Sequence, residues 1–523
     1  EGTVKVSFVQ EPDSLNPLYT TMYFSGITRD LWLRGMFIFD DQLNPIPQLA
    51  AEVPTTENGG ISEDGKTITV KLREGVTWSD GTPVTSDDFT FTYDMIMSDQ
   101  NTVGTRYPYD PVVESVTAPD PGTVVIQLTQ VFAAWRTSLF LYVLPKHVLQ
   151  PVFDADGTLD NAEWNRAPTV GVGPYVFEEF AAGSHLSFVA NPNWIEPTQI
   201  GRVFIQIVPD DAAQEAAIIA GDVDLGVFLS SDQIERIEAG GDIKVVAVQS
   251  GYDESWFLNV REGLAHPAML DKNVRRALAL ATDRFSIVEN LLVADLNPVN
   301  ATFWSNNPPY GSDTLEPYPY DPDEAMRLLD EAGWSDSDGD GIRDQVIDGA
   351  KVDLTLRYVT TTRELRKNVQ ALVAQQWEAV GIGAELRNFE SDQFFAQYDE
   401  QGPIAIGDFD VAEWSSVPTS FPDPDASETW RCADIPSDDN PSGENWSGYC
   451  TEELDALLVE QSSLTDFDAR KAVYEQIQQI MYDDTAYIGI WLDPDLWSVN
   501  QRVEGVSIGG VNPFWNISTW SLK

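Results

Sequence analysis

Residues 63–89 read EDGKTITVKLREGVTWSDGTPVTSDDF, and every local signal in them agrees. Apolar and polar residues alternate over positions 68–72, which is the period of a half-buried strand, and Asp-Gly turns bound this segment on both sides. Thr85 is then suited to cap a helix, with Asp88 reaching back from the third helical position. The stretch therefore predicts a turn, a strand, a second turn and a helix.

The same region contains a match to a nucleotide-binding motif that we reject. Residues 60–67 fit the pattern G-x-x-x-x-G-K-[ST] letter for letter. A phosphate loop follows a strand and opens a helix, whereas Lys66 here opens a strand. Glu63 and Asp64 would also repel a phosphate. The sequence therefore predicts no nucleotide site at this position.

Residues 72–88 resemble the signature of a known family. They keep the pattern L-R-x-G-V-x-W-x-D-G-x-P-V-T and an acidic helix start throughout, as in the family 5 extracellular solute-binding proteins of ABC transporters, the oligopeptide- and dipeptide-binding group. Further family motifs are Ser-Leu-Asn-Pro at 14–17, Gly-x-Gly-Pro-Tyr at 171–175, Asn-Pro-x-Trp at 191–194 and Val-Arg-x-Ala at 274–277. The resemblance extends from Pro12 to about Trp491.

This resemblance implies an α/β architecture, the type II periplasmic-binding-protein fold. In it, two lobes are built from three domains of mixed sheets flanked by helices, with a hinge between the lobes. A length of 523 residues agrees with more than one hydrophobic core. We expect residues 1–46, 167–252 and 487–523 to form domain I of the first lobe. Residues 47–166 would then be domain II, inserted in that lobe, and residues 253–486 domain III, the second lobe.

The chain is strongly acidic, with a formal net charge of −53. Such a charge disfavours binding to nucleic acid or to an anionic membrane surface. The acids are spread along the whole chain, which favours adaptation of an exposed surface over attraction of cationic ligands. No apolar run approaches the roughly 18 residues of a membrane span. The chain begins at Glu1 without a basic, apolar leader, so we expect any export signal to have been removed or to lie outside this sequence.

Composition disfavours several enzyme classes. The three histidines, at 147, 185 and 266, form no cluster with zinc-like spacing, and no G-x-S-x-G elbow is present. Glycoside hydrolysis needs only two carboxyl groups, so a carbohydrate-active enzyme stays as a remote alternative among 84 acids and 16 tryptophans.

The resemblance instead implies a monomeric, non-enzymatic periplasmic or extracellular protein. Such a protein captures a peptide between two closing lobes and delivers it to an ABC transporter permease. A binder of oligosaccharides or another small solute of the same family is the alternative. Whether a lipid anchors a missing N-terminus stays open.

The resemblance also implies ligand-contacting residues. The segment past the first strand would contribute Tyr19, Thr20, Met22 and Tyr23. The aromatic residues of this segment could instead simply pack on the following helix. The second lobe would contribute Trp256 and Trp414.

Peptide-binding members carry an Asp three residues after this last Trp, and it pairs with the ligand's α-amino group. Val417 stands at that position here. Because an unpaired buried ammonium is costly, Asp423 or Asp425 is expected to replace the missing carboxylate.

The two cysteines stand 18 residues apart, around a loop rich in Pro, Ser, Gly, Asn and Asp. In an exported protein, Cys432 and Cys450 are expected to form one disulfide, the alternative being two free thiols.

Residues 336–344 copy positions 1, 3, 5, 6 and 9 of a calcium loop. The candidate ligands of a structural calcium ion are the carboxylates of Asp336, Asp338, Asp340 and Asp344 and the carbonyl of Ile342. Position 12, normally a bidentate acid, is Ile347. The alternative is a solvated acidic turn, and no other cofactor is expected.

Overall fold

The computed structural model describes residues 2–248, 250–307, 309–418 and 420–523. The chain forms two compact units. Unit 1 comprises Glu1–Ser250, Ser420–Asp423 and Asp495–Lys523, and unit 2 comprises Gly251–Thr419 and Pro424–Pro494. The chain therefore changes unit after residues 250, 419, 423 and 494.

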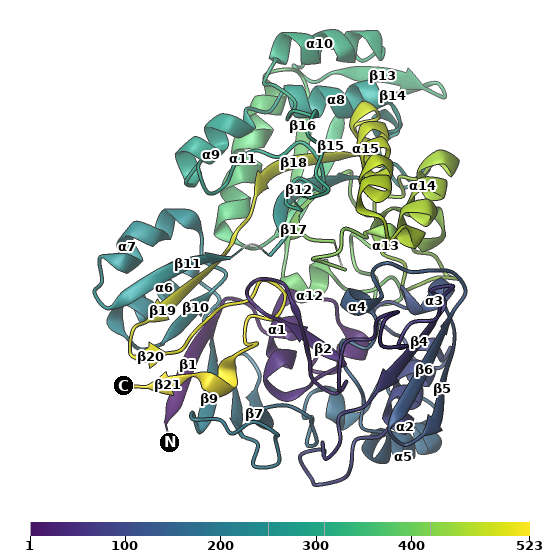
Figure 1. Cartoon of the computed structure of the whole chain (residues 1–523). Helices are drawn as coiled ribbons and strands as arrows, with labels where there is room; N and C mark the ends of the chain where they lie inside the picture. Colours follow the sequence, from purple (N-terminus) through teal and green to yellow (C-terminus); the bar gives the residue numbers. More distant parts are fainter. Residues whose placement is uncertain (1, 249, 308, 419) are drawn as a thin grey trace. The chain divides into compact units, whose positions relative to one another are not determined.

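Unit 1 is built on a seven-stranded mixed sheet in the order β11-β19-β10-β1-β9-β8-β7 (Figure 1). β1 pairs in parallel with β9 and β10, and the other pairings are antiparallel. The predicted first strand is confirmed as β1, where Val4, Val6 and Phe8 are fully buried. The strands are β1 (Thr3–Phe8), β7 (Tyr175–Ala181), β8 (His185–Ala190), β9 (Arg202–Ile207), β10 (Leu225–Val227), β11 (Ile243–Val248) and β19 (Asp495–Asn500).

The decisive stretch of sequence lies in a second, three-stranded sheet of unit 1. Its strand is β4 (Thr67–Lys71), which pairs antiparallel with β6. Its helix is α2 (Ser86–Met97), whose capping box joins Thr85 and Asp88. The Thr85 backbone N–H donates to the Asp88 carboxylate at 2.9 Å. Both local predictions are confirmed, and Lys66 precedes a strand, as the rejection of a phosphate loop requires.

The other elements of unit 1 are short strands and helices. The strands are β2 (Phe37–Phe39), β3 (Pro45–Pro47), β5 (Val113–Asp120), β6 (Thr123–Leu128), β20 (Val503–Glu504) and β21 (Ser521–Leu522). The helices are α1 (Tyr23–Trp32), α3 (Tyr109–Val112), α4 (Trp135–Ser138), α5 (Lys146–Asp156), α6 (Asp211–Ala220) and α7 (Ile234–Glu238), with 3-10 turns η1 (Pro17–Tyr19), η2 (Glu163–Asn165), η3 (Ser231–Gln233) and η6 (Ile517–Thr519).

The Gly-x-Gly-Pro-Tyr motif has a packing reason. A Cβ atom at Gly171 would lie 2.5 Å from the backbone oxygen of Trp32, and one at Gly173 would lie 2.7 Å from its carbonyl carbon. Any larger residue would therefore push the end of α1 away from this turn. Trp32 itself is fully buried in the hydrophobic core of unit 1.

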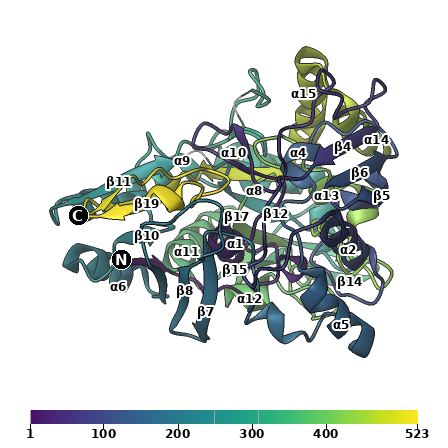
Figure 2. The same cartoon turned by 60° about the horizontal axis from the view of Figure 1, so that its bottom comes forward.

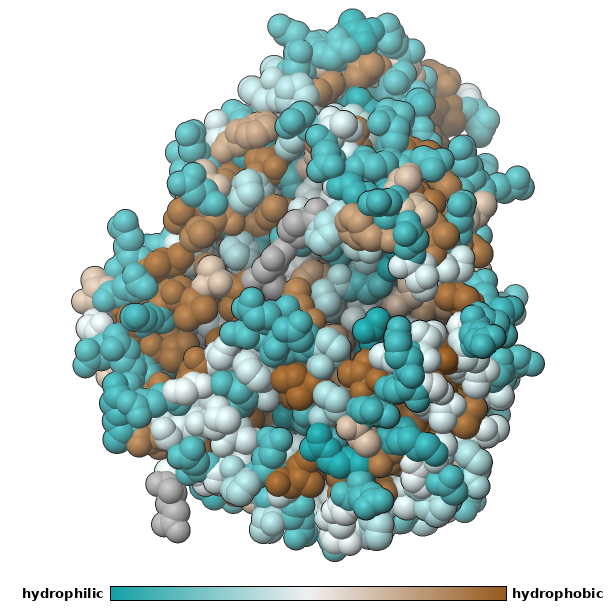
Figure 3. Space-filling view, viewed as in Figure 1, coloured by the Kyte–Doolittle hydropathy of each residue, from teal (hydrophilic) through white to brown (hydrophobic). Residues whose placement is uncertain are grey.

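The C-terminal segment of unit 1 lies beside the edge of the seven-stranded sheet. β11 and β19 are neighbours, and the C-terminal end of the chain lies close to them in both views (Figures 1 and 2). β20 pairs with β21 in the same segment. Figure 3 shows apolar side chains at the surface over β11 and β19. This part of unit 1 thus leaves part of a sheet face exposed.

Unit 2 is built on a five-stranded sheet in the order β16-β15-β17-β12-β18. β15 pairs in parallel with β16 and β17, and β12 pairs antiparallel with β17 and β18. The strands are β12 (Asp253–Leu258), β15 (Thr355–Thr361), β16 (Gly383–Phe389), β17 (Val411–Ser416) and β18 (Tyr487–Leu492), with the separate hairpin β13 (Asp344–Ile347) and β14 (Ala350–Asp353).

Helices flank this sheet, and aspartates cap two of them. Asp271 accepts from Asn273 at the start of α8 (Lys272–Leu280), and Asp321 accepts from Glu324 at the start of α10 (Pro322–Glu331). The others are α9 (Arg284–Leu291), α11 (Glu364–Glu378), α12 (Ser391–Phe394), α13 (Ser427–Trp430), α14 (Glu452–Ser463) and α15 (Phe467–Asp483), with 3-10 turns η4 (Pro267–Leu270) and η5 (Cys432–Asp434). Among the described residues, no helix is both long and apolar enough to cross a membrane.

Two expected boundaries differ from the units of the structure. Residues 420–423, expected within the second lobe, belong to unit 1. The sequence also places the return of the chain to the first lobe at residue 487, but β18 pairs with β12 inside unit 2, and unit 1 resumes only at Asp495. β18 is apolar and nearly all buried, so its sequence indicates a buried strand without indicating which sheet contains it. The division of the first lobe into domains I and II stays a prediction.

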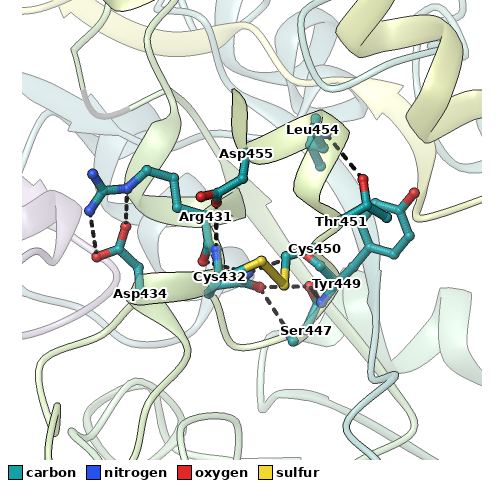
Figure 4. Close-up of a disulfide and its surroundings, with 11 residues drawn as sticks. Arg431, Cys432, Asp434, Ser447, Tyr449, Cys450, Thr451, Leu454 and Asp455 are labelled. Atoms are coloured by element: carbon teal, nitrogen blue, oxygen red, sulfur yellow. Dashed lines mark hydrogen bonds and ion pairs between the residues drawn. A yellow bond between two sulfur atoms is a disulfide. The ribbon is translucent and has the colours of Figure 1, made fainter. Parts of the chain in front are cut away.

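The expected disulfide is confirmed. Cys432 and Cys450 are bonded, with their Cα atoms 5.3 Å apart (Figure 4). Asp455 on α14 accepts a hydrogen bond from the Cys432 backbone N–H at 2.8 Å, and Thr451 caps the same helix. The bridge therefore anchors an irregular loop of unit 2 to the start of α14.

Reduction of this bond should destabilise the protein. Closing a loop with a sequence separation of 18 lowers the entropy of the unfolded chain by an amount equivalent to about 3 kcal/mol. We expect the urea midpoint of unfolding to fall when reductant is added, and the Cys432→Ser/Cys450→Ser variant to show the low midpoint without reductant. Two reactive thiols in the unfolded, unreduced protein would contradict the bond.

Candidate functional site

In unit 1, the segment between β1 and α1 is held in place by one carboxylate. Asp13 accepts hydrogen bonds at 2.6 Å from the hydroxyls of both Thr20 and Ser25, and at 2.8 Å from the backbone N–H of Ser14. Burial raises the pKa of Asp13 above its usual value, against the opposing effect of these hydrogen bonds. The loop that the sequence indicated as ligand-contacting is thus a fixed structure.

The four predicted residues of this segment are all partly exposed. The Thr20 hydroxyl donates to Asp13 and accepts from the backbone N–H of Met22 at 3.1 Å. The Tyr23 hydroxyl donates to Asp495 at 2.5 Å, and the Tyr19 hydroxyl lies 3.4 Å from the Asn101 side-chain oxygen. Burial and the nearby Asp160 raise the pKa of Tyr19, so this hydroxyl stays neutral. The segment offers neutral hydroxyls and partly exposed rings.

In unit 2, Trp414 forms the centre of an aromatic cluster. Its ring stacks on Phe257 with centroids 4.0 Å apart and an interplanar angle of 11°. The rings of Trp446 and Phe395 lie 5.7 and 6.3 Å from it. Trp414 is only 5% exposed. Most of its indole surface therefore packs against other rings of the same unit.

Trp256 and Trp414, both expected to contact a ligand, lie on different faces of their sheet. In the β12–β17 pair, Trp414 lies opposite Ser255, while Trp256 lies opposite Glu413. Neighbouring residues of a strand point to opposite faces, so the two tryptophans lie on different faces of the sheet. Trp256 is fully buried and packs on Trp377. It is a core residue of unit 2.

The two candidate carboxylates after Trp414 also differ. Asp425 is fully buried and accepts from the backbone N–H and hydroxyl of Ser427 and, at 2.7 Å, from the Gln461 side-chain amide. Asp423 is only partly buried and belongs to the Ser420–Asp423 segment of unit 1. Sequence spacing alone could not separate these two residues.

Sequence reasoning missed a set of acids in and beside β12, β17 and β18, most of which are buried. Arg366 binds Glu254 through two nitrogens, at 2.7 and 3.1 Å. The Ser415 hydroxyl lies 2.7 Å from Glu254 and 2.9 Å from Asp493. Burial raises the pKa of Asp493. The only available signal was the presence of acids inside apolar strands.

Asp253 completes one side of this set. It accepts from the Asn300 amide at 2.8 Å, from the Ser416 hydroxyl at 3.1 Å and from the Tyr487 hydroxyl. Burial raises the pKa of Asp253 to about 8, although these hydrogen bonds oppose the rise. Asp253 is therefore mostly protonated at neutral pH.

Glu413 is the second acid of this kind. It accepts from the Tyr358 hydroxyl and from the Trp256 indole N–H, the latter at 3.3 Å. Its other oxygen, Oε1, has no hydrogen-bond partner among the described residues. Burial, with a further contribution from the nearby Glu254 charge, raises the pKa of Glu413 to about 8. Burying a neutral carboxyl group in the protein interior costs far less free energy than burying a carboxylate.

The candidate calcium loop brings only part of its predicted ligands together. Oxygen atoms of Asp336, Asp338 and Asp340 lie within 4.8 Å of one another, and all three residues are exposed. The Asp344 carboxylate is held by the Ser337 hydroxyl at 2.7 Å and by its backbone N–H at 3.0 Å.

The ammonium group of Lys351 competes with a cation in this loop, because it pairs with Asp338 and, at 3.0 Å, with Asp353. Carboxylate oxygens are suitable calcium ligands, so the cluster of Asp336, Asp338 and Asp340 fits the prediction. The fourth predicted carboxylate, Asp344, is instead hydrogen-bonded to Ser337. The Ile342 carbonyl ligand and the calcium ion itself stay predictions.

The fold defines a class, the periplasmic binding proteins. Residues 44–435 match the family described as bacterial extracellular solute-binding proteins, family 5 Middle. This match covers more than half of the chain. The chain therefore belongs to family 5 of the bacterial extracellular solute-binding proteins.

Similar proteins of known kind agree with this assignment. The oligopeptide-binding protein AppA of Bacillus subtilis is 27% identical, over 100% of this chain and 92% of its own length. The structure of AppA from Bacillus subtilis in complex with a nonapeptide has a TM-score of 0.89 at 26% identity, covering 100% of this chain and 99% of that one. Heme-binding protein A of Haemophilus influenzae is 25% identical over 89% of this chain and 84% of its length. These relatives are binding proteins, and their ligands differ.

The buried acids predict a pH dependence of stability. Asp253 and Glu413 keep their protons in the folded protein up to a pKa of about 8, whereas in the unfolded chain they lose them near pH 4. The folded state then binds more protons, so the free energy of unfolding falls as pH rises from about 4 through about 8.

We expect thermal melting between pH 5 and pH 9 to show this fall. Glu413→Gln should flatten the slope, because its amide never ionises, while Glu378→Gln, at an exposed position on α11, should leave the slope unchanged. Equal slopes for the wild type and Glu413→Gln would contradict the protonated state.

Calcium removal tests the acidic loop. If Asp336, Asp338 and Asp340 bind the ion in the folded state, added calcium should raise the melting temperature and a chelator should reverse the rise. Asp340→Asn should abolish the effect, and Asp348→Asn, just outside the loop, should keep it. An unchanged melting temperature would contradict calcium binding and support the alternative, a solvated acidic turn.

Proposed function

We propose that this protein captures a peptide outside the cytoplasm and delivers it to the permease of an ABC transporter. The similarity to AppA over the full length of this chain, together with the nonapeptide in the AppA structure, carries the proposal. In this proposal the protein works as a monomer and catalyses no reaction. Two lobes would close around the ligand, and the permease would recognise this closed conformation.

Peptide binding requires a carboxylate for the ligand's ammonium group. Removing that ammonium from water costs several kcal/mol or more unless a counter-charge meets it. Asp425 is engaged with Ser427 and Gln461 inside unit 2, which leaves it no exposed surface for a ligand. Asp423 keeps part of its surface exposed. We therefore assign the ammonium contact to Asp423.

The segment between β1 and α1 would supply the other contacts from unit 1. Asp13 holds this segment in one conformation, so binding does not require the loop to be ordered first. The partly exposed rings of Tyr19 and Tyr23 and the Met22 side chain offer apolar surface to peptide side chains. Thr20 acts mainly by positioning Met22, because its hydroxyl is already engaged on both sides.

The packing of Trp414 favours peptides over sugars. Oligosaccharide binding by stacking needs an accessible indole face. Trp414 has one face stacked on Phe257, has Trp446 nearby and is 5% exposed. Trp256 is fully buried. Neither ring presents the platform on which the oligosaccharide alternative depended.

The Asp423 assignment can be tested with peptides that differ in one charge. We expect calorimetry with a mixed peptide library to show binding, and acetylation of the peptide N-termini to weaken it by about tenfold or more. Asp423→Asn should weaken binding of the free peptides by a similar factor and remove the preference for a free N-terminus.

Asp425→Asn is the matched control. It should lower the unfolding midpoint, because Asp425 is a buried acceptor, and it should keep the preference for free N-termini. Heat from oligosaccharides alone, unaffected by either substitution, would reject peptide binding. Peptide binding that ignores acetylation would reject only the role of Asp423.

A further inference from the structure

A concave surface lies in unit 1, and none of the residues proposed to contact a peptide lines it. We call it the β11–β19 groove. Its volume is about 580 Å³, within the range of small-molecule sites. It is lined by Asp41, Lys244, Val246, Ala247, Val248, Val499, Gln501, Val503, Gly505, Val506, Ser507, Ile508 and Lys523. Figures 1 and 3 show this region, where β11 and β19 lie under apolar surface.

Strand register explains why the floor of the groove is aliphatic. β11 is the edge strand of the seven-stranded sheet, and its Lys244 pairs with Val499 of the neighbouring strand β19. Val246 and Val248 follow Lys244 at alternate positions, so they share its face of the sheet. The opposite face carries Ile243, which is buried in a separate cluster with α7. Val246 is left 38% exposed at the open edge.

The lining of the groove holds more basic than acidic side chains, unlike the chain as a whole. Two lysines and one aspartate line it, whereas the whole chain has 31 basic and 84 acidic residues. Asp41 accepts a hydrogen bond from the Ser507 hydroxyl at 2.7 Å. Lys523 lies 3.8 Å from Glu504. Lys244 forms no ion pair with any residue that the structure describes. A bound anion could therefore form an ion pair with the Lys244 ammonium group without displacing a carboxylate of the protein.

The chemistry of the lining selects one class of ligand. None of the described residues that line the groove is aromatic, so sugars and nucleobases find no stacking surface among them. The aliphatic floor suits an alkyl chain, and Lys244 at the floor's edge suits a carboxylate. We propose that the β11–β19 groove binds a single-chain carboxylate amphiphile, with its alkyl chain over Val246, Val248 and Val499 and its head group at Lys244.

Other occupants fit the charge less well. A second copy of this chain would bring another net charge of −53 to the same place, and an anionic bilayer would meet the same long-range repulsion. A small monoanion carries one charge and needs only the local field of the groove. The site uses none of the residues assigned to peptide binding, so this inference stands whether or not the proposed function is correct.

Calorimetry with dodecanoate, kept below its micelle concentration, tests the proposal. We expect saturable binding at one site, weaker binding of decanoate by about fourfold for each methylene lost, and little binding of acetate. Dodecyltrimethylammonium should bind less well than dodecanoate, despite the acidity of the chain. Peptide ligands should not compete.

Variants locate the site. Lys244→Glu should weaken dodecanoate binding by about fivefold or more, Lys244→Arg should retain it, and Lys5→Glu should leave it unchanged. Lys5 is an exposed lysine of the same unit, outside the groove. Val246→Asp should also weaken binding, and its partly exposed position lets circular dichroism confirm that the fold persists. Hydrogen exchange should slow at residues 243–248 and 503–508 on addition of dodecanoate.

Four outcomes would overturn the proposal. The first is an absence of saturable heat, and the second is equal binding by Lys244→Glu and the wild type. The third is tighter binding of the cationic amphiphile. The fourth is a different occupant, shown by a dimer in sedimentation that Val246→Asp dissolves, or by binding to vesicles containing 30% phosphatidylglycerol in the absence of any binding of monomeric dodecanoate.

Discussion

The alternation of side chains along β12 is the constraint on which unit 2 depends. β12 pairs on both sides, with β17 and β18, and all of its residues are buried. Trp256 points into one hydrophobic core and Phe257 into the other, where it stacks on Trp414. A shift of one residue would exchange the contents of the two cores. The register of this strand therefore organises both layers of the unit at once.

The same strand register brings carboxyl groups into the interior. Asp253 and Glu254 begin β12, and its pairing with β17 places Glu413 opposite Trp256. The charge of Glu254 is met by Arg366 in a two-point contact, whereas Asp253 and Glu413 accommodate burial by holding their protons. Desolvation thus divides three neighbouring acids into one ion pair and two neutral hydrogen-bonding groups. For an acidic protein, this arrangement couples the integrity of one sheet to the pH of its surroundings.

Unit 1 combines rigid and open features on one scaffold. At one position the Asp13 carboxylate holds the segment between β1 and α1, so that partly exposed rings are presented without an ordering cost. At another, the edge strand β11 leaves an aliphatic, locally basic surface beside the C-terminal segment. The net charge keeps the protein dispersed over most of its surface. In so acidic a protein, a surface lined by two lysines, Lys244 and Lys523, is therefore a candidate binding site for an anion.

Local sequence determined the features that are completed within a few residues. The Thr85–Asp88 capping box could be predicted because its hydrogen bonds span only three positions of the chain. The disulfide followed from the number and spacing of the cysteines in an exported protein, and family membership followed from the unbroken motif at residues 72–88. Only the tertiary structure placed Trp256 and Trp414 on opposite faces, separated Asp423 from Asp425, assigned β18 to unit 2 and formed the β11–β19 groove. These outcomes depend on strand register and on partners tens to hundreds of residues away, and no local period or spacing encodes which partner a buried strand or a carboxylate will meet.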